Sequence, residues 1–399
     1  MKIRNFRLYF FGQAISVSGT FMQAIAQAWL VLTLTGSGVA LGLVLALQSL
    51  PVLVLSPWGG VIADRFRKRR LLYLTQTASG LLALILGLLV LTGAAQLWMV
   101  YLLALGLGLV NAVDNPTRQA FVSEMVGKEE LRNAVTLNSS QVNLARVIGP
   151  AIAGVLIATT GLALCFLLNA ASYLAVLAGL ALMRDDEFHA APPVPARKGQ
   201  LREGFRYAWA NPVLRNVLIM VAIIGTLTYE FQVSLPLLAE FTFKGSAESY
   251  ALLTAALGLG SVVGGLLTAT SRRRSVRLLA ALAVAFGVTV LAAAVAPTLI
   301  LEVAAIAAVG FVSIIFLSMG NTLLQLESSA EMRGRVMSFW TIAFLGSTAI
   351  GGPLIGWISQ VAGPRWGLVV GGVAAVVAAG VGYALMRQSQ RRESARKSF

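Results

Sequence analysis

Two glutamates stand out because each lies inside a long run of apolar residues, where an ionised carboxylate is costly. Glu230 falls roughly 27 Å along a helix counted from Pro212. Glu302 lies near the end of its own apolar run, close enough to meet water. A carboxyl group at such a depth favours its protonated form unless it is paired or hydrated. We therefore expect Glu230, with Glu302 as the second candidate, to bind and release a coupling proton. The alternative for Glu230 is a structural acid that never titrates.

A row of polar side chains follows the first apolar run at steps of three and four residues. Its members are Gln13, Ser16, Thr20, Gln23 and Gln27. This spacing places them on one face of a helix. Because polar groups are costly against lipid, the face should meet other helices or a hydrated cavity. We expect a substrate cavity whose lining includes Gln13, Thr20, Gln23, Gln27, Thr226, Tyr229 and Glu230, with helix packing as the alternative for this row.

Residues for catalysis, metal binding or ATP hydrolysis do not form a recognisable set in the sequence. The chain has one cysteine, Cys165, inside an apolar run, and one histidine, His189, in a linker without evident metal partners. A phosphate-binding loop of the GxxxxGK[ST] form is absent from the sequence. We expect a protein that is not an enzyme, holds no metal or cofactor, and uses the proton as its coupling ion.

The elements that position these groups are predicted to be membrane-spanning helices. Of the 399 residues, 57% are hydrophobic and only 12% are charged, so most of the chain requires lipid around it. Twelve apolar windows have the length of a spanning helix. They cover residues 8–34, 40–62, 71–92, 97–116, 140–160, 163–183, 213–239, 249–269, 277–296, 298–320, 337–360 and 366–386. The predicted fold class is an all-α membrane protein with twelve transmembrane helices.

The basic residues indicate orientation. A formal net charge of +15 could suggest nucleic acid as a partner, but the Lys and Arg residues occupy short turns between apolar spans. All but three of the 31, namely Arg146, Lys244 and Arg365, fall on one side of the spans, which the positive-inside rule assigns to the cytoplasm. We expect a monomer in the cytoplasmic (inner) membrane with both termini cytoplasmic. Its expected partners are membrane lipid and an amphiphilic small molecule, and not nucleic acid.

Two parts of the chain repeat each other in the same order. Gly59-Gly60 and the basic turn after it match Gly264-Gly265 about 205 residues later, and Gly149-Pro150 matches Gly352-Pro353. Such repeats are typical of the two halves of secondary transporters. The predicted parts are an N-terminal six-helix half over 1–183, a cytoplasmic linker over 184–212, a C-terminal six-helix half over 213–386 and a basic cytoplasmic tail over 387–399.

The linker contains an amphipathic segment with Phe205 and Trp209 four residues apart. We expect this segment to lie flat on the inner membrane surface. The alternative is a disordered tether.

The loop between the second and third spans carries the residues Gly60-x-x-x-Asp64-Arg65-x-x-Lys68-Arg69. Asp64 can accept hydrogen bonds from a helix N-terminus at the membrane edge. In a chain with twelve spans in two repeated halves, this loop resembles the signature of the major facilitator superfamily. Arg67 stands where that family usually has glycine, which questions the tight turn expected there.

The resemblance implies a cytoplasmic latch that closes the inner side of the transporter in its outward-facing state. Its expected members are Gly60, Asp64, Arg65, Lys68, Asp114 and Arg118. Asp114, placed at the cytoplasmic end of the fourth span, is the acid expected to receive Lys68 or Arg65. The alternative is that the basic residues of the loop only anchor it to anionic lipid.

A glycine-proline element on the fifth span, Gly149-Pro150-Ala-Ile-Ala-Gly154, resembles that of the drug:proton antiporter branch of the superfamily. Residues 116–122, 133–138 and 145–150 are similar to the subgroup of enterobactin exporters and macrolide efflux proteins. Arg146, beside the element, is expected to counter a buried acid, to bind an anionic substrate, or to snorkel to the inner surface.

The resemblance implies proton-coupled export of an amphiphilic small molecule, such as a drug or a siderophore, by alternating access. One alternative is an uptake carrier or lipid flippase with the same fold. The other is a membrane sensor or scaffold that transports nothing.

Overall fold

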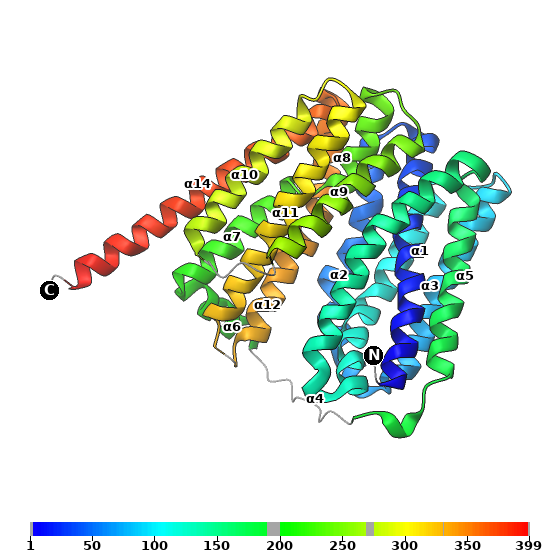
Figure 1. The fold of residues 1–399 in the computed structure, drawn as a ribbon, viewed down its shortest axis with the longest axis horizontal. Coiled ribbons are helices and arrows are strands. Elements are labelled where there is room, and N and C mark those ends of the chain that lie inside the picture. Colours follow the sequence, from blue (N-terminus) through cyan, green and yellow to red (C-terminus); the bar gives the residue numbers. More distant parts are fainter. Residues whose placement is uncertain (1–2, 190–199, 269–274, 330, 398–399) are drawn as a thin grey trace. The chain divides into compact units, whose positions relative to one another are not determined.

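The computed structural model describes residues 3–189, 200–268, 275–329 and 331–397, and its regular elements are helices (Figure 1). Within these residues, 12 helical segments are long and apolar enough to cross a membrane. The prediction of an all-α protein with twelve spans is confirmed. The chain divides into two compact units, of which the first contains Met1–Val194 with Lys244–Ala255 and the second contains Pro195–Phe243 with Ala256–Phe399.

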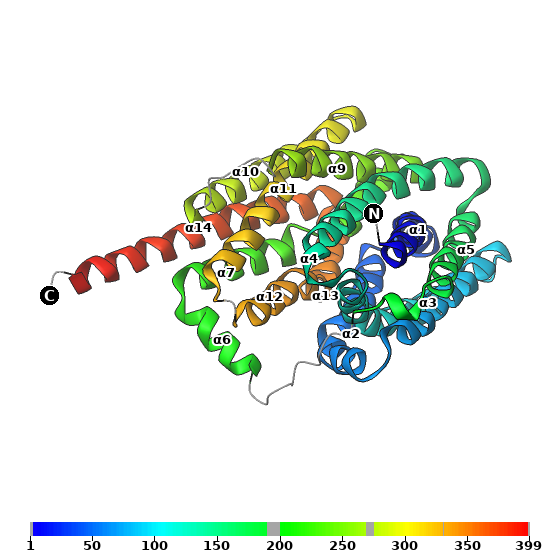
Figure 2. The same cartoon turned by 60° about the horizontal axis from the view of Figure 1, so that its bottom comes forward.

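The first unit is a bundle of long helices. They are α1 (Arg4–Thr35), α2 (Gly38–Arg65), α3 (Lys68–Leu91), α4 (Leu97–Thr160) and α5 (Leu162–Ala181). In this unit α1 packs on α4 and α5, α2 packs on α4, and α3 packs on α5 (Figures 1 and 2). A short turn, η1 (Asp185–Glu187), follows α5.

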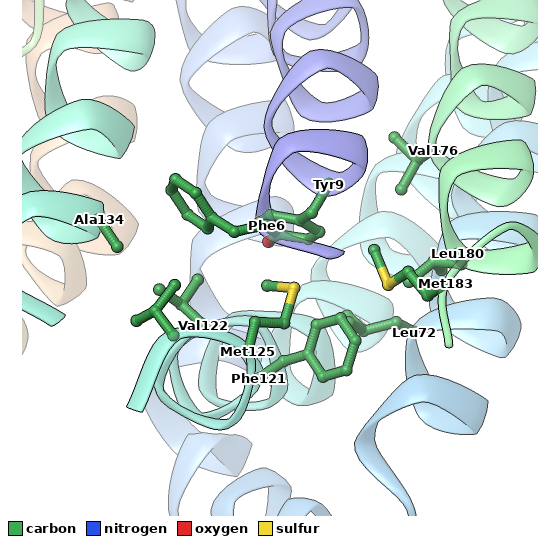
Figure 3. Close-up of a cluster of buried hydrophobic side chains, with 11 residues drawn as sticks. Phe6, Tyr9, Leu72, Phe121, Val122, Met125, Ala134, Val176, Leu180 and Met183 are labelled. Carbon is green, nitrogen blue, oxygen red and sulfur yellow. The ribbon is translucent and has the colours of Figure 1, made fainter. Parts of the chain in front are cut away.

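α4 joins two spans that the sequence separates by a loop. The predicted spans end at residue 116 and restart at residue 140, whereas α4 continues through this stretch and departs from helical geometry only at Gly127 (φ 68°, ψ −178°). The helix continues because apolar residues of this stretch, including Phe121 and Met125, pack into a buried cluster with Phe6 and Tyr9 of α1 (Figure 3). The backbone angles at Gly127 are those that side-chain-bearing residues rarely adopt.

Two residues near the start of the predicted linker, Phe188 and His189, contact α4 of the first unit. The ring of Phe188 lies 5.3 Å from that of Phe121, and the His189 backbone N–H donates to the Glu124 carbonyl at 2.8 Å. The His189 side chain is exposed, as expected for a linker residue.

The second unit is built from shorter pieces. They are α6 (Gln200–Ala210), α7 (Pro212–Leu227), α8 (Phe231–Leu237), the π-helical η2 (Leu238–Thr242), α9 (Ala247–Thr268), α10 (Val276–Ala294), α11 (Leu299–Glu327), α12 (Arg333–Thr341), the π-helical η3 (Ile342–Gly346), α13 (Thr348–Ala362) and α14 (Pro364–Lys397). The first residues of α9 belong to the first unit. α6 covers the amphipathic segment of the linker, and in it the rings of Phe205 and Trp209 stack with centroids 5.1 Å apart.

The seventh span is interrupted, where the sequence predicts one continuous helix. The N–H groups of Thr228 and Tyr229 both donate to the Ile224 carbonyl, and Glu230 has left the helical conformation (φ −87°, ψ 42°) before α8 begins. The Thr228 hydroxyl donates to the Gly371 carbonyl on α14 at 2.7 Å. A contact with another helix therefore stabilises the break.

Candidate functional site

Asp114, which is buried, forms an ion pair with the partly exposed Arg118 in the first unit. The Asp114 carboxylate is 1% exposed and also accepts hydrogen bonds from the Thr75 hydroxyl at 2.6 Å and the Gln76 amide at 2.8 Å. The Arg118 guanidinium donates to the Gln13 side-chain oxygen at 3.0 Å. Three helices, α1, α3 and α4, thus contribute to one network, and each charge has hydrogen-bond partners in it.

The predicted pairing of Lys68 with Asp114 is wrong in this structure. Lys68 pairs with Glu124 at 2.6 Å. The reason is the length of the fourth span: it continues past Asp114 to Gly127, which carries Glu124 to the basic loop and leaves Asp114 inside the bundle.

The other latch residues lie in different surroundings. Arg65 is exposed, and a Cβ added to Gly60 would meet nothing within 4 Å, whereas one added to Gly59 would meet the Ala112 carbonyl. The close approach of α2 to α4 therefore depends on Gly59. The side chain of Asp64 lies outside what the structure describes, so its role as a latch stays a prediction.

The polar row of α1 is buried except at Thr20. The Asn169 amide donates to the Gln23 side-chain oxygen at 2.6 Å. Gln23 and Gln27 also line a small pocket within the first unit, together with Gln48, Ser79 and Tyr173. Gln13 and Gln23 thus contact side chains of other helices, which was one of the two environments expected for this row.

The glycine-proline element brings α4 against α1. A Cβ added to Gly149 would lie 2.8 Å from the Ser18 carbonyl oxygen and 2.6 Å from Phe21 Cβ. The Arg146 guanidinium lies over the Phe21 ring at 5.8 Å, a cation–π contact. Pro150 and Gly154 are buried, and a Cβ on Gly154 would lie 3.0 Å from Ala251. These glycines permit close packing within the first unit.

Glu230 lies at the helix break of the second unit and is 3% exposed. Its Oε1 has no hydrogen-bond partner among the described residues, and the Thr348 hydroxyl is its side-chain hydrogen-bonding neighbour. The Tyr229 phenol donates to the Ser313 hydroxyl at 3.2 Å. A carboxyl group buried without a charged partner is what a proton-exchanging site requires.

Glu302 is fully buried, so the prediction that it meets water is wrong. It lies in the first turn of α11, and both of its carboxyl oxygens lack hydrogen-bond partners in the described part of the chain. Arg365 is the cation that acts on it, and that guanidinium donates to the Ala296 carbonyl in the turn before α11 at 2.7 Å. The second unit therefore holds two buried carboxyl groups with unpartnered oxygens.

Several residues of these networks were missed by reasoning from the sequence. They are Thr75, Gln76, Glu124, Asn169 and Thr348. The pairing of Asp114 with Arg118 could have been found, because the two residues are four apart on a helix. The others come together only through the packing of distant segments.

Solved structures show which fold this arrangement has. A bacterial homologue of the human lysosomal transporter Spinster, in an inward-facing and unoccupied conformation, matches over 97% of this chain and 98% of its own, with a TM-score of 0.74 and 17% identity. A POT family transporter in complex with a thioalcohol-conjugated peptide matches over 96% of both chains, with a TM-score of 0.77 and 12% identity. The fold is that of the major facilitator transporters.

The family described as transmembrane secretion effector matches residues 1–398, and the chain belongs to that family of the major facilitator superfamily. The resemblance found in the sequence is confirmed, as is the prediction of a transporter and not an enzyme.

Characterised relatives transport siderophores. The enterobactin exporter EntS of Escherichia coli O1:K1 / APEC is 28% identical over 90% of this chain and 86% of its own length. The staphyloferrin A transporter of Staphylococcus aureus (strain NCTC 8325 / PS 47) is 31% identical over 65% of this chain and 65% of its own, so the match spans just under two thirds of that relative. These relatives support a multi-pass membrane protein that transports small molecules.

Proposed function

We propose that the protein exports an amphiphilic small molecule of the siderophore type across the cytoplasmic membrane in exchange for protons. The observation that carries this proposal is the match to an enterobactin exporter over 90% of the chain. Export through this fold proceeds by alternating access, in which two halves open a binding site to one side of the membrane at a time.

The direction of proton movement is set by the proton gradient across the cytoplasmic membrane. In the proposed exchange, protons enter down this gradient while the substrate leaves. One pH unit supplies about 1.4 kcal/mol per proton, and a potential of 100 mV supplies about 2.3 kcal/mol. The free energy from the pH gradient and the membrane potential can drive export only through a group that is exposed alternately to the two sides.

Glu230 is the group proposed for this role. It is buried, uncharged side chains surround it, and its Oε1 is unpartnered among the described residues. Glu302 is the second candidate, because its carboxyl group is also buried but has a cation, Arg365, acting on it.

Transport into inside-out proteoliposomes tests the proposal, with enterobactin as the probe and macrolides as alternative substrates. An imposed pH gradient, acidic inside, should drive accumulation by the wild-type protein. Glu230→Gln mimics the protonated carboxyl, so this variant should bind the probe but fail to accumulate it against a gradient, while downhill exchange persists. Accumulation by the variant equal to that of the wild type would contradict coupling through Glu230. Accumulation that requires the opposite pH gradient would support an uptake carrier instead.

A further inference from the structure

The contact between the seventh and eleventh spans is formed where both helices depart from regular geometry. On one side, α7 ends at Leu227 and the chain bends through Glu230. On the other side, the π-helical η3 (Ile342–Gly346) comes directly before α13. Short π-helical segments inside longer helices occur frequently at functional sites. Here the two irregular stretches meet beside a buried carboxyl group.

Two glycines, one on each side, bring the backbones together. A Cβ added to Gly225 would lie 2.9 Å from the Ala343 carbonyl oxygen and 2.9 Å from the Ser347 hydroxyl. A Cβ added to Gly351 would collide with the Thr226 carbonyl and would lie 2.6 Å from Glu230 Oε1. The backbone of α13 therefore lies directly beside the carboxyl group, and a side chain at position 351 cannot fit without a shift.

The helix break leaves the polar groups near this contact incompletely bonded. The helical donor for the Thr226 carbonyl would be the Glu230 N–H, and this hydrogen bond is not formed among the described residues. The Thr348 hydroxyl, at the first position of α13, faces the Glu230 carboxyl. Thr348 and Gly351 on α13 and the Thr226 carbonyl before the break thus lie close to the Glu230 carboxyl.

Charged groups do not compete for this role in the described part of the chain. Glu230 forms no ion pair there, and the neighbouring titratable side chain, Tyr229, directs its phenol to Ser313. Arg365, at the start of α14, acts on Glu302. The hydroxyl and the backbone contact of α13 therefore act on Glu230 without a competing ion pair among the described residues.

We propose that Thr348 and Gly351 are positioning residues that set the pH at which Glu230 exchanges its proton. The proposal rests on the function assigned to Glu230 above. The Thr348 hydroxyl stabilises the ionised carboxylate by donating to it, and Gly351 excludes water by letting the backbone of α13 contact Oε1. A movement of α13 at η3 would change both contacts together, so this helix would control proton release from a group that it does not carry.

Infrared titration of the purified full-length protein in lipid vesicles tests this assignment without a transported ligand. The carboxyl C=O band of Glu230 is the one lost in Glu230→Gln, and its pH midpoint is then measured in each variant. Thr348→Val keeps the shape of the side chain but removes the hydroxyl, so the midpoint should rise by about 1 pH unit. Thr348→Ser should restore the wild-type midpoint. Gly351→Ala should separate α13 from Oε1, admit water and lower the midpoint.

Gly380→Ala on α14 is the matched control, because a Cβ there would meet nothing within 4 Å. Its midpoint should equal that of the wild type. Opposite shifts in Thr348→Val and Gly351→Ala support the proposal. Unchanged midpoints in both variants overturn it, as does the absence of any titrating band that depends on Glu230. Transport measurements separate this failure from that of the proposed function, which fails if Glu230→Gln still accumulates the probe or if accumulation requires the opposite pH gradient.

Discussion

The ion pair between Asp114 and Arg118 joins a buried carboxylate to a guanidinium that is only 32% exposed. Asp114→Asn keeps the shape but removes one charge, which leaves the partly buried Arg118 guanidinium without its counter-charge. We expect a loss of about 1–3 kcal/mol in the free energy of unfolding, seen as a drop in the melting temperature of the purified protein. A melting temperature equal to that of the wild type would show that water or lipid compensates the arginine.

The contact between Lys68 and Glu124 can be separated from the pairing with Asp114 by charge exchange. Exchanging Lys68 and Glu124 should recover part of the activity and stability lost in either single substitution, because the 2.6 Å ion pair survives reversal. Exchanging Lys68 and Asp114 should give additive losses. The measurement is a double-mutant cycle on transport rate. Coupling of Lys68 to Asp114 without coupling of Lys68 to Glu124 would contradict the contact seen here.

Gln23 and Gln27 differ in their bonding although both line the same pocket. Gln23→Ala leaves the buried Asn169 amide without its acceptor, which should cost about 1–3 kcal/mol of stability. Gln27→Ala should change the order of preference among transported compounds more than it changes stability. Thermal unfolding and competition assays on both variants distinguish these effects, and equal losses for all compounds in both would indicate that the two amides only pack.

At the scale of the elements, the bend in α4 depends on one residue. Gly127 has φ 68° and ψ −178°, a region that is almost exclusive to glycine. Gly127→Ala should cost about 1–3 kcal/mol and lower the melting temperature, whereas Gly380→Ala, in regular helix, should leave it unchanged or slightly higher. If the two alanine variants melted alike, the bend would tolerate a side chain.

The elements also show why some features could be predicted from the sequence and others could not. The lengths of the apolar runs predict twelve spans because the thickness of the membrane sets the length of a helix. The continuation of α4 depends on where Phe121 and Met125 pack, and that is a tertiary property. The break at Glu230 is not marked by glycine or proline between residues 228 and 230. It depends instead on the bond from Thr228 to Gly371, which lies on another helix.

At the scale of the whole molecule, the distribution of basic residues predicts which loops face the cytoplasm. A variant lacking the buried Cys165 gives a background for single cysteines. In intact cells a membrane-impermeant maleimide should label Ala94→Cys, in the exposed turn between α3 and α4, and should not label Arg67→Cys. Permeabilised cells should allow labelling of both. The reverse pattern in intact cells would place the termini outside.

Inside α4, only the non-helical residue Gly127 interrupts the helix between the fourth and fifth spans, so no loop separates these two spans. Insertions are tolerated where exposed backbone can loop out without disturbing hydrogen bonds or buried contacts. Around Gly127 the backbone is helical on both sides, and the carbonyl of Glu124 is already engaged by the linker. An epitope tag or protease site inserted there would have to unwind a helix. The junction between the fourth and fifth spans is therefore a poor place to cut or extend this protein.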